Sequence, residues 1–99
     1  MFTIADNTIY SISELFKIFG DNTRCKLVAS LFNKSQNVSS LSKELSMTTS
    51  AISHSLRILR QAKIVTTKRE GKEIICSLSD KHIFKIFEMA KEHIEEWED

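Results

Sequence analysis

The spacing of apolar residues changes twice along this 99-residue chain, and these changes restrict the possible folds more than any other feature. From residue 9 to about residue 62, apolar residues recur three or four positions apart, as in amphipathic helices. Residues 64–79 alternate instead and are rich in β-branched side chains, which predicts a hairpin. Helical spacing returns over residues 81–97. The sequence therefore predicts several helices, one hairpin and a last helix.

The composition agrees with a mainly helical domain. The chain has two glycines and no proline, too few turn-forming residues for an all-β sandwich. Apolar residues make up 41%, enough for one core and too many for a disordered chain. We expect one domain over residues 1–99, and because so short a chain buries little of its surface, this length favours a dimer.

A helix-turn-helix is predicted in the middle of the chain. Helices over residues 9–20 and from Asn22 to Phe32 come first, with Gly20 ending one and Asp21 capping the next. NKSQN is expected to be a polar turn. The short helix VSSLSKELS then leads to a second helix that Thr48 or Thr49 caps and that runs to about Ala62. The side chains that this helix should bury are Ala51, Ile52, Leu56 and Leu59.

A hairpin and a last helix complete the predicted order. IVTTKR and EIICSLS read as two strands joined around EGK, with Gly71 at the tip. Such a hairpin beside a helix-turn-helix is called a wing. Asp80 is expected to cap a helix over residues 81–97. The apolar stripe of this helix is Ile83, Ile86, Phe87, Ala90, Ile94 and Trp97, and we expect Phe84, Phe87, Met89 and Trp97 to form a dimer core.

The net charge of +1 hides an uneven distribution. Residues 53–72 contain six basic side chains and one acid, Glu70, so this segment can meet phosphate. The basic residues are Arg57, Arg60, Lys63, Lys68, Arg69 and Lys72. Residues 80–99 contain seven acids, Asp99 among them, against three lysines. The acidic end can attract cations.

Three motifs, in order and at matching separations, resemble the ArsR/SmtB family of bacterial winged-helix repressors over about residues 12–97. LFKIFGDNTRCKLVASL resembles its opening helices, although Asn22 stands where a proline is common. TTSAISHSLRILRQAKIV resembles its recognition helix, including the Ser53–His54 pair, and TKREGKEIICSLSD resembles its wing. The resemblance implies a winged helix-turn-helix homodimer that binds an inverted-repeat operator in double-stranded DNA and is released when metal binds.

The expected DNA contacts lie on the recognition helix and the wing, where exposed polar and basic side chains can reach bases and phosphates. They are Thr49, Ser50, Ser53, His54, Arg57, Lys68, Arg69 and Lys72. For His54, helix packing behind the groove face is an equal alternative. For the wing residues, the alternative is a solvated hairpin.

The resemblance offers two kinds of metal site. A cysteine pair before the helix-turn-helix is missing, since Asn37 and Ser39 stand at the matching positions. The other site lies on the last helix, and Asp80, His82, His93 and Glu96 match it residue by residue. Two imidazoles and two carboxylates suit Zn²⁺ in tetrahedral geometry, and Co²⁺ fits the same set. The alternative is that these side chains belong to a solvated helix face, with Asp80 serving as an N-cap.

The spacing of the two histidines predicts how such a site is built. His82 and His93 are 11 residues apart, close to three helical turns, so they point the same way but stand about 16 Å apart along the axis. One straight helix cannot bring both to one ion, since ligands lie about 2 Å from zinc. An antiparallel copy of the helix can, and two-fold symmetry then gives two intersubunit sites per dimer.

Other functions remain as alternatives. The chain can be a winged-helix repressor that answers nickel or cobalt, or oxidation of Cys25 or Cys76. A nickel site needs more ligands than these four, and residues 1–10 contain no histidine. A third reading is a metal-binding or interaction module that touches no DNA. An enzyme is not expected, because we find no nucleophile–base pair, glycine-rich phosphate loop or zinc site with a vacant position.

The predicted setting is the cytoplasm. No apolar run approaches the roughly 18–20 residues that span a bilayer, and MFTIADNTIY lacks the basic flank and apolar stretch of a secretion signal. We therefore expect no membrane partner. In a reducing compartment Cys25 and Cys76 are expected to be buried thiols rather than a disulfide.

Overall fold

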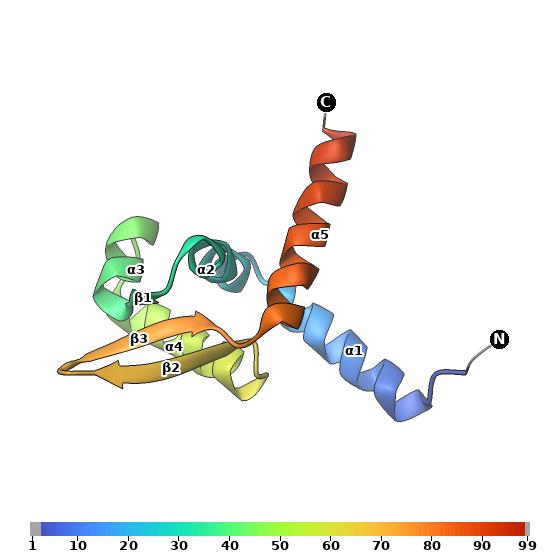
Figure 1. Ribbon diagram of the computed structural model, residues 1–99, viewed down its shortest axis with the longest axis horizontal. Coiled ribbons are helices and arrows are strands. Elements are labelled where there is room, and N and C mark those ends of the chain that lie inside the picture. The colour runs from blue at the N-terminus through green and yellow to red at the C-terminus, as the bar shows by residue number, and fades with distance from the viewer. Residues whose placement is uncertain (1–2, 99) are drawn as a thin grey trace.

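The computed structural model describes residues 3–98 and is a winged helix-turn-helix of five helices and a three-stranded sheet (Figure 1). The elements are α1 (Asp6–Phe19), α2 (Asn22–Asn33), β1 (Gln36–Asn37), α3 (Val38–Leu45), α4 (Thr49–Gln61), β2 (Val65–Glu70), β3 (Glu73–Leu78) and α5 (Lys81–Trp97). The predicted fold class is confirmed. Within the described residues, no helix is long and apolar enough to cross a membrane.

Side-chain caps set the starts of three central helices. The Asp21 carboxylate accepts the N–H of Arg24 at 3.0 Å, which confirms its predicted role at the start of α2. Thr48, rather than Thr49, caps α4 by accepting the N–H of Ala51 at 3.1 Å. The short helix α3 is capped in the same way by Asn37.

The first helix begins three residues earlier than predicted, at Asp6 rather than residue 9. Its added turn is polar and exposed, so no apolar spacing marks it in the sequence. Ala5 precedes the helix and supplies no side-chain cap, so the usual start signal is missing as well.

One apolar core lies where α2, α3 and α4 meet the sheet and the start of α5. Its fully or nearly fully buried members are Leu27, Val28, Leu31, Leu41, Ile52, Leu56, Leu59, Ile64, Val65, Cys76 and Ile83. Three of the four residues predicted as the inner stripe of α4 are among them, and Ala51 is half-buried. Ser55 of the same helix is also buried, although its polarity gave no reason to expect this.

The sheet confirms the predicted wing and corrects one prediction. β2 and β3 pair antiparallel from Val65 opposite Leu78 to Glu70 opposite Glu73, and Gly71 has the left-handed φ of 63° that the tight turn requires. NKSQN is not only a turn, because Gln36 and Asn37 form β1 on the other edge of β3. Two polar residues carry no recognisable alternation, so only the neighbouring strand reveals this pairing.

A buried polar network attaches α3 to α2. The Gln36 side chain, 5% exposed, donates to the carbonyl oxygen of Ser30 at 3.3 Å and accepts from the Ser40 hydroxyl at 2.8 Å. The Ser30 hydroxyl in turn donates to the Glu44 carboxylate. Because buried polar groups are costly unless paired, this network specifies how the first helix of the helix-turn-helix sits on the domain.

Helices α1 and α5 extend away from the core and keep apolar surface exposed (Figure 1). The large exposed side chains of the two helices are Ile9, Tyr10, Ile12, Phe16, Phe84, Met89, Ile94 and Trp97. Two of the residues expected in a dimer core have partners within the chain: Phe84 stacks on Phe32 with ring centroids 4.2 Å apart, and Phe87 meets the same ring at 5.2 Å.

We predict that Thr48→Ala lowers the free energy of unfolding by about 1 kcal/mol, because the N–H of Ala51 loses its acceptor. Urea denaturation of the metal-free chain measures the effect. Thr49→Ala is the matched control and should change the stability much less, since Thr49 lies inside α4 and is exposed. Equal losses in the two variants would contradict the assignment of Thr48 as the cap.

Candidate nucleic-acid interface and metal site

One face of α4 presents the polar and basic side chains that the sequence singled out. Thr49, Ser50, Ser53, His54 and Arg57 are all exposed on this helix. The structure thus gathers these five candidates on a surface that a base edge or phosphate can reach. Exposure also argues against a buried packing role for His54.

A shallow hollow of about 400 Å³ runs along this face, and it adds a residue that the predicted set of contacts left out. Arg60 lines it together with Ser50, Ser53, His54 and Arg57. Arg60 follows Arg57 by three positions, so the helical spacing of the two arginines was the signal available in the sequence.

The wing continues this basic surface. Lys68, Arg69 and Lys72 are exposed on the hairpin of β2 and β3. A second hollow, of about 160 Å³, lies between α4 and the wing, with Arg57 on one wall and Thr67 on the other. Within residues 3–98, the observed ion pairs involve none of these basic side chains, so their charges remain available to phosphate.

The four candidate metal ligands lie at the two ends of α5. Asp80 precedes the helix, and its Oδ1 accepts the N–H groups of His82 at 2.8 Å and Ile83 at 3.1 Å. The bond from Ile83 is the main reason that the pKa of Asp80 lies below its ordinary value, with a smaller contribution from His82. The His82 Nδ1 atom is 3.4 Å from Asp80 Oδ1, and the His82 side chain is 89% exposed. This pair can therefore offer two ligands to an ion from the start of the helix.

His93 and Glu96 form the second pair, on the last turns of the same helix. Both are exposed, and the imidazole of His93 meets the indole of Trp97 edge to face with ring centroids 6.4 Å apart. Because α5 is one continuous helix from Lys81 to Trp97, the two pairs stay apart by about 16 Å along its axis. In the part of the chain that the structure describes, no three His, Cys, Asp or Glu side chains come together around a point that could hold an ion.

The donor chemistry of these two half-sites fits zinc. Each supplies one imidazole and one carboxylate, and the two brought together would supply four N and O ligands, the number that a closed tetrahedral site needs. The exposure of all four side chains leaves them accessible to a second copy of the chain.

The two cysteines, and the position where the family's other metal site has its cysteine pair, provide weaker candidates for a functional site. Cys76 is fully buried in β3, and burial raises the pKa of its thiol despite the nearby Arg60 guanidinium, so the reactive thiolate is disfavoured. Cys25 is half-buried and also a free thiol. Asn37, at the position matching a family cysteine, uses its side chain to cap α3.

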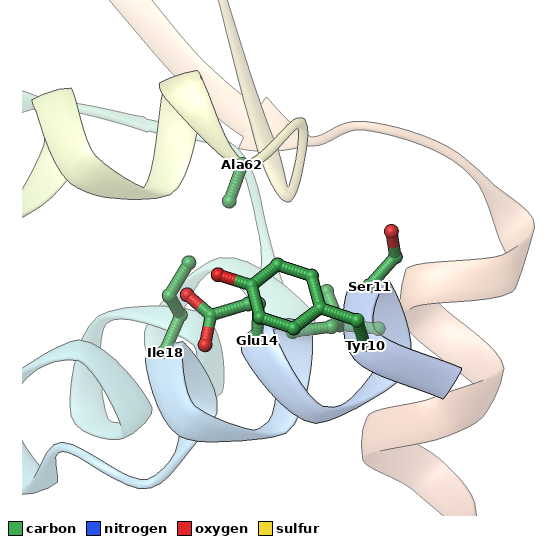
Figure 2. A pocket seen from close by; sticks show the side chains of 6 residues that line it. Tyr10, Ser11, Glu14, Ile18 and Ala62 are labelled. Carbon is green, nitrogen blue, oxygen red and sulfur yellow. The ribbon is translucent and has the colours of Figure 1, made fainter. Parts of the chain in front are cut away.

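A groove of about 310 Å³ separates α1 from the C-terminal end of α4 (Figure 2). Tyr10, Glu14 and Ile18 of α1 form one wall, and Ala62 points toward them from the other side (Figure 2). The C-terminal end of α4 is thus bordered by open space on this side.

Comparison with known proteins gives a consistent picture. A family model described as "Bacterial regulatory protein, arsR family" matches residues 21–67. The chain is 31% identical over 85 residues to a "Transcriptional repressor SmtB homolog" of Synechocystis sp., covering 86% of this chain and 64% of that protein. It is 35% identical to an uncharacterised HTH-type transcriptional regulator of Methanocaldococcus jannaschii, covering 81% of this chain and 91% of that protein.

A solved structure agrees with the fold. The chain superposes on the AntR antimony-specific transcriptional repressor with a TM-score of 0.86 at 25% identity, over 99% of this chain and 89% of the other. For the first three curated relatives, the chain spans 64%, 62% and 61% of their length, a little under two thirds. These proteins are transcriptional regulators, in agreement with the expectation that the chain is not an enzyme.

We predict that Asp80→Asn and Asp80→Ala separate the two roles of this residue. Asparagine keeps an oxygen for the N-cap, so Asp80→Asn should stay close to the native stability without metal, whereas Asp80→Ala should be less stable. Both should bind zinc more weakly than the native chain. Thermal melting and zinc titration measure the two effects, and native zinc affinity in Asp80→Asn would exclude the carboxylate as a ligand.

The same variants have a predicted pH dependence. The pKa of Asp80 is lower in the folded chain than its ordinary value of 3.8, so its contribution to stability is present above that value. This contribution is lost as the pH falls through the lowered pKa of the folded state. Melting between pH 5 and about pH 2 should therefore show a smaller loss of stability for Asp80→Asn than for the native chain.

Proposed function

Since the chain belongs to the arsR family of bacterial regulatory proteins, we propose that it is a zinc-responsive transcriptional repressor. In this proposal a homodimer in the cytoplasm binds an inverted-repeat operator in double-stranded DNA. Zinc binds at two sites between the C-terminal helices of the subunits and releases the operator.

The placement of the four ligands carries this proposal. Asp80 and His82 at one end of α5, and His93 and Glu96 at the other, are each half of a tetrahedral donor set. An antiparallel α5 from a second subunit brings the complementary half alongside, with the two-fold axis crossing the middle of the helix near Phe87. The symmetry then repeats the site.

Exposed apolar surface supports the dimer. Ile94 and Trp97 of α5 are 54% and 79% exposed, and Phe16 of α1 is 56% exposed. Side chains of this size are normally removed from water, and a partner subunit along α5 can cover them. Covering this face and completing the metal sites would then be one and the same event.

The ligand chemistry favours zinc over the metals that other relatives are named for. One relative is a cadmium resistance regulatory protein homolog and a structural neighbour is antimony-specific, so the family by itself does not select the ion. Soft ions of that kind prefer thiolates, whereas the proposed site offers imidazole and carboxylate groups. Cobalt suits the same ligands, and the supply of each metal decides between them.

The basic face of α4 and the wing support the DNA-binding part. A major groove about 12 Å wide admits a helix such as α4, whose Ser50, Ser53 and Arg57 can then meet base edges or phosphates. The wing lysines and Arg69 can contact the neighbouring backbone. Two-fold symmetry of the dimer sets two such helices against an inverted repeat.

Zinc acts here as a regulator. Four protein ligands leave no vacant position for a catalytic water, so the ion stabilises one arrangement of the subunits. If that arrangement holds the two α4 helices in a poor fit to successive major grooves, zinc weakens operator binding. By linkage, the operator must then weaken zinc binding by the same factor. The coupling free energy between two such sites is typically about 1–3 kcal/mol.

We predict that His93→Ala keeps operator binding but loses zinc-induced release. A titration of the operator complex with zinc, cobalt, nickel and cadmium, with measured stoichiometry, tests this. The native chain should bind one ion per subunit and respond most strongly to zinc. Glu92→Ala, the neighbouring exposed residue, is the matched control and should respond as the native chain does. Zinc-induced release that survives in His93→Ala would refute the assigned site.

We predict that Arg57→Gln weakens operator binding and lowers the slope of log K against log salt by about one for each subunit, because one phosphate contact is lost. Lys85→Gln, which removes an exposed charge from α5, is the control and should leave the slope unchanged. Binding that depends little on salt in the native chain would favour a module that does not touch DNA.

A further inference from the structure

The chain leaves α4 through a residue in the left-handed conformation. Ala62 is the C-cap, and Lys63 follows with a φ of 61°. The N–H of Lys63 donates to the carbonyl oxygen of Arg60 at 3.0 Å, and that of Ile64 donates to Leu59 at 2.9 Å. Glycine is usual at this position of such a helix end. Because the Cβ of lysine disfavours the conformation, neighbouring groups must hold it in place.

Ser79 holds this turn from the opposite segment. Its hydroxyl donates to the carbonyl oxygen of Lys63, and its N–H donates to the carbonyl oxygen of Ile64 at 2.9 Å. Ser79 lies just beyond Leu78, whose pairing with Val65 ends the ladder of β2 and β3. The two bonds therefore join the exit of α4 directly to the segment that enters α5.

The residue after Ser79 is Asp80, a candidate zinc ligand. Asp80 is fixed on one side by its capping bonds to α5, where Ile83 is anchored in the core, and on the other by its peptide bond to Ser79. Any shift of Asp80 and His82 toward an ion therefore acts on Ser79, and through its hydroxyl on Lys63.

The end of α4 has room to respond to such a shift. Ala62, next to Lys63, borders the groove of about 310 Å³ whose other wall is α1 (Figure 2). A small change in the angle of this helix end can be absorbed by the groove, without repacking of the buried side chains around Leu59 and Ile64.

We propose that Ser79 is the positioning residue that couples the Asp80–His82 half-site to the recognition helix α4 of the same subunit. This inference rests on the proposed zinc-responsive function and deepens it. Zinc on the half-site fixes the bond from Ser79 to Lys63 in one geometry, and this bond fixes how α4 leaves the junction. The hydroxyl is not a ligand, so it affects the coupling between sites and not the binding of zinc itself.

Ser79→Ala removes the hydroxyl and keeps the backbone bond to Ile64. We expect zinc stoichiometry, zinc affinity and metal-free operator affinity to stay within two-fold of native. The ratio of operator Kd with and without zinc should fall by about five-fold, which corresponds to one hydrogen bond of ordinary net strength. Chelator competition with and without operator should show the same fall, because coupling is reciprocal.

Two further variants control for general effects on the junction. Ser79→Thr keeps the hydroxyl and should restore the native ratio. Ser77→Ala removes a hydroxyl from β3, two residues before Ser79; this hydroxyl is 2.6 Å from that of Ser35, in a different segment, and its loss should leave the ratio native. Loss of coupling in Ser77→Ala as well would overturn the specific role of Ser79.

The native chain offers a measurement that does not depend on whether a variant folds. Zinc should slow amide hydrogen exchange at Ser79 and Ile64, whose N–H groups both take part in the junction. Unchanged exchange there, or an unchanged Kd ratio in Ser79→Ala when the native chain does release operator on zinc, overturns the inference and leaves the proposed function standing. A native chain that ignores zinc overturns both.

Discussion

The structure depends on a single small apolar core, to which the helices and strands contribute unequal numbers of buried side chains. Side chains of α2, α3, α4 and the sheet fill it, with Ile83 as the buried contribution of α5. The helix-turn-helix and the wing are thereby held firmly together, while α1 and most of α5 keep apolar faces in water. Exposed apolar surface of this extent is costly for a small domain, and this cost favours the homodimer in our proposal.

The proposed metal chemistry follows from the rigidity of α5. A continuous helix cannot fold back on itself, so ligands three turns apart have to be shared with another copy. Because the helix is rigid, a displacement at either of its ends can be transmitted to the rest of the domain. At the N-terminal end, the cap at Asp80 and the bonds of Ser79 connect the helix to Lys63, two residues beyond the last residue of α4. In our proposal the metal site and the DNA-binding surface therefore meet at this junction.

Much of the fold could be predicted from local signals. Asp21 and Gly71 mark their helix cap and turn through preferences that act within a few residues, whereas Gly20 follows the last residue of α1 with a right-handed φ of −71°. Contacts between residues far apart in the sequence were not predicted. The strand at Gln36 and Asn37 exists only because β3 lies beside it, and Phe84 stacks on Phe32 of α2. Neither contact leaves a periodic trace in the sequence.

The sequence by itself determined the order of elements, the basic face of α4 and the spacing of the two pairs of candidate ligands, whose histidines are 11 residues apart, because periodicity and spacing along one helix are local properties. Only the tertiary structure decided that the Ser79 hydroxyl donates to the carbonyl oxygen of Lys63. Lys63 and Ser79 are 16 residues apart in the chain. They meet because the hairpin between them folds back on itself, and the apolar core holds its base in place.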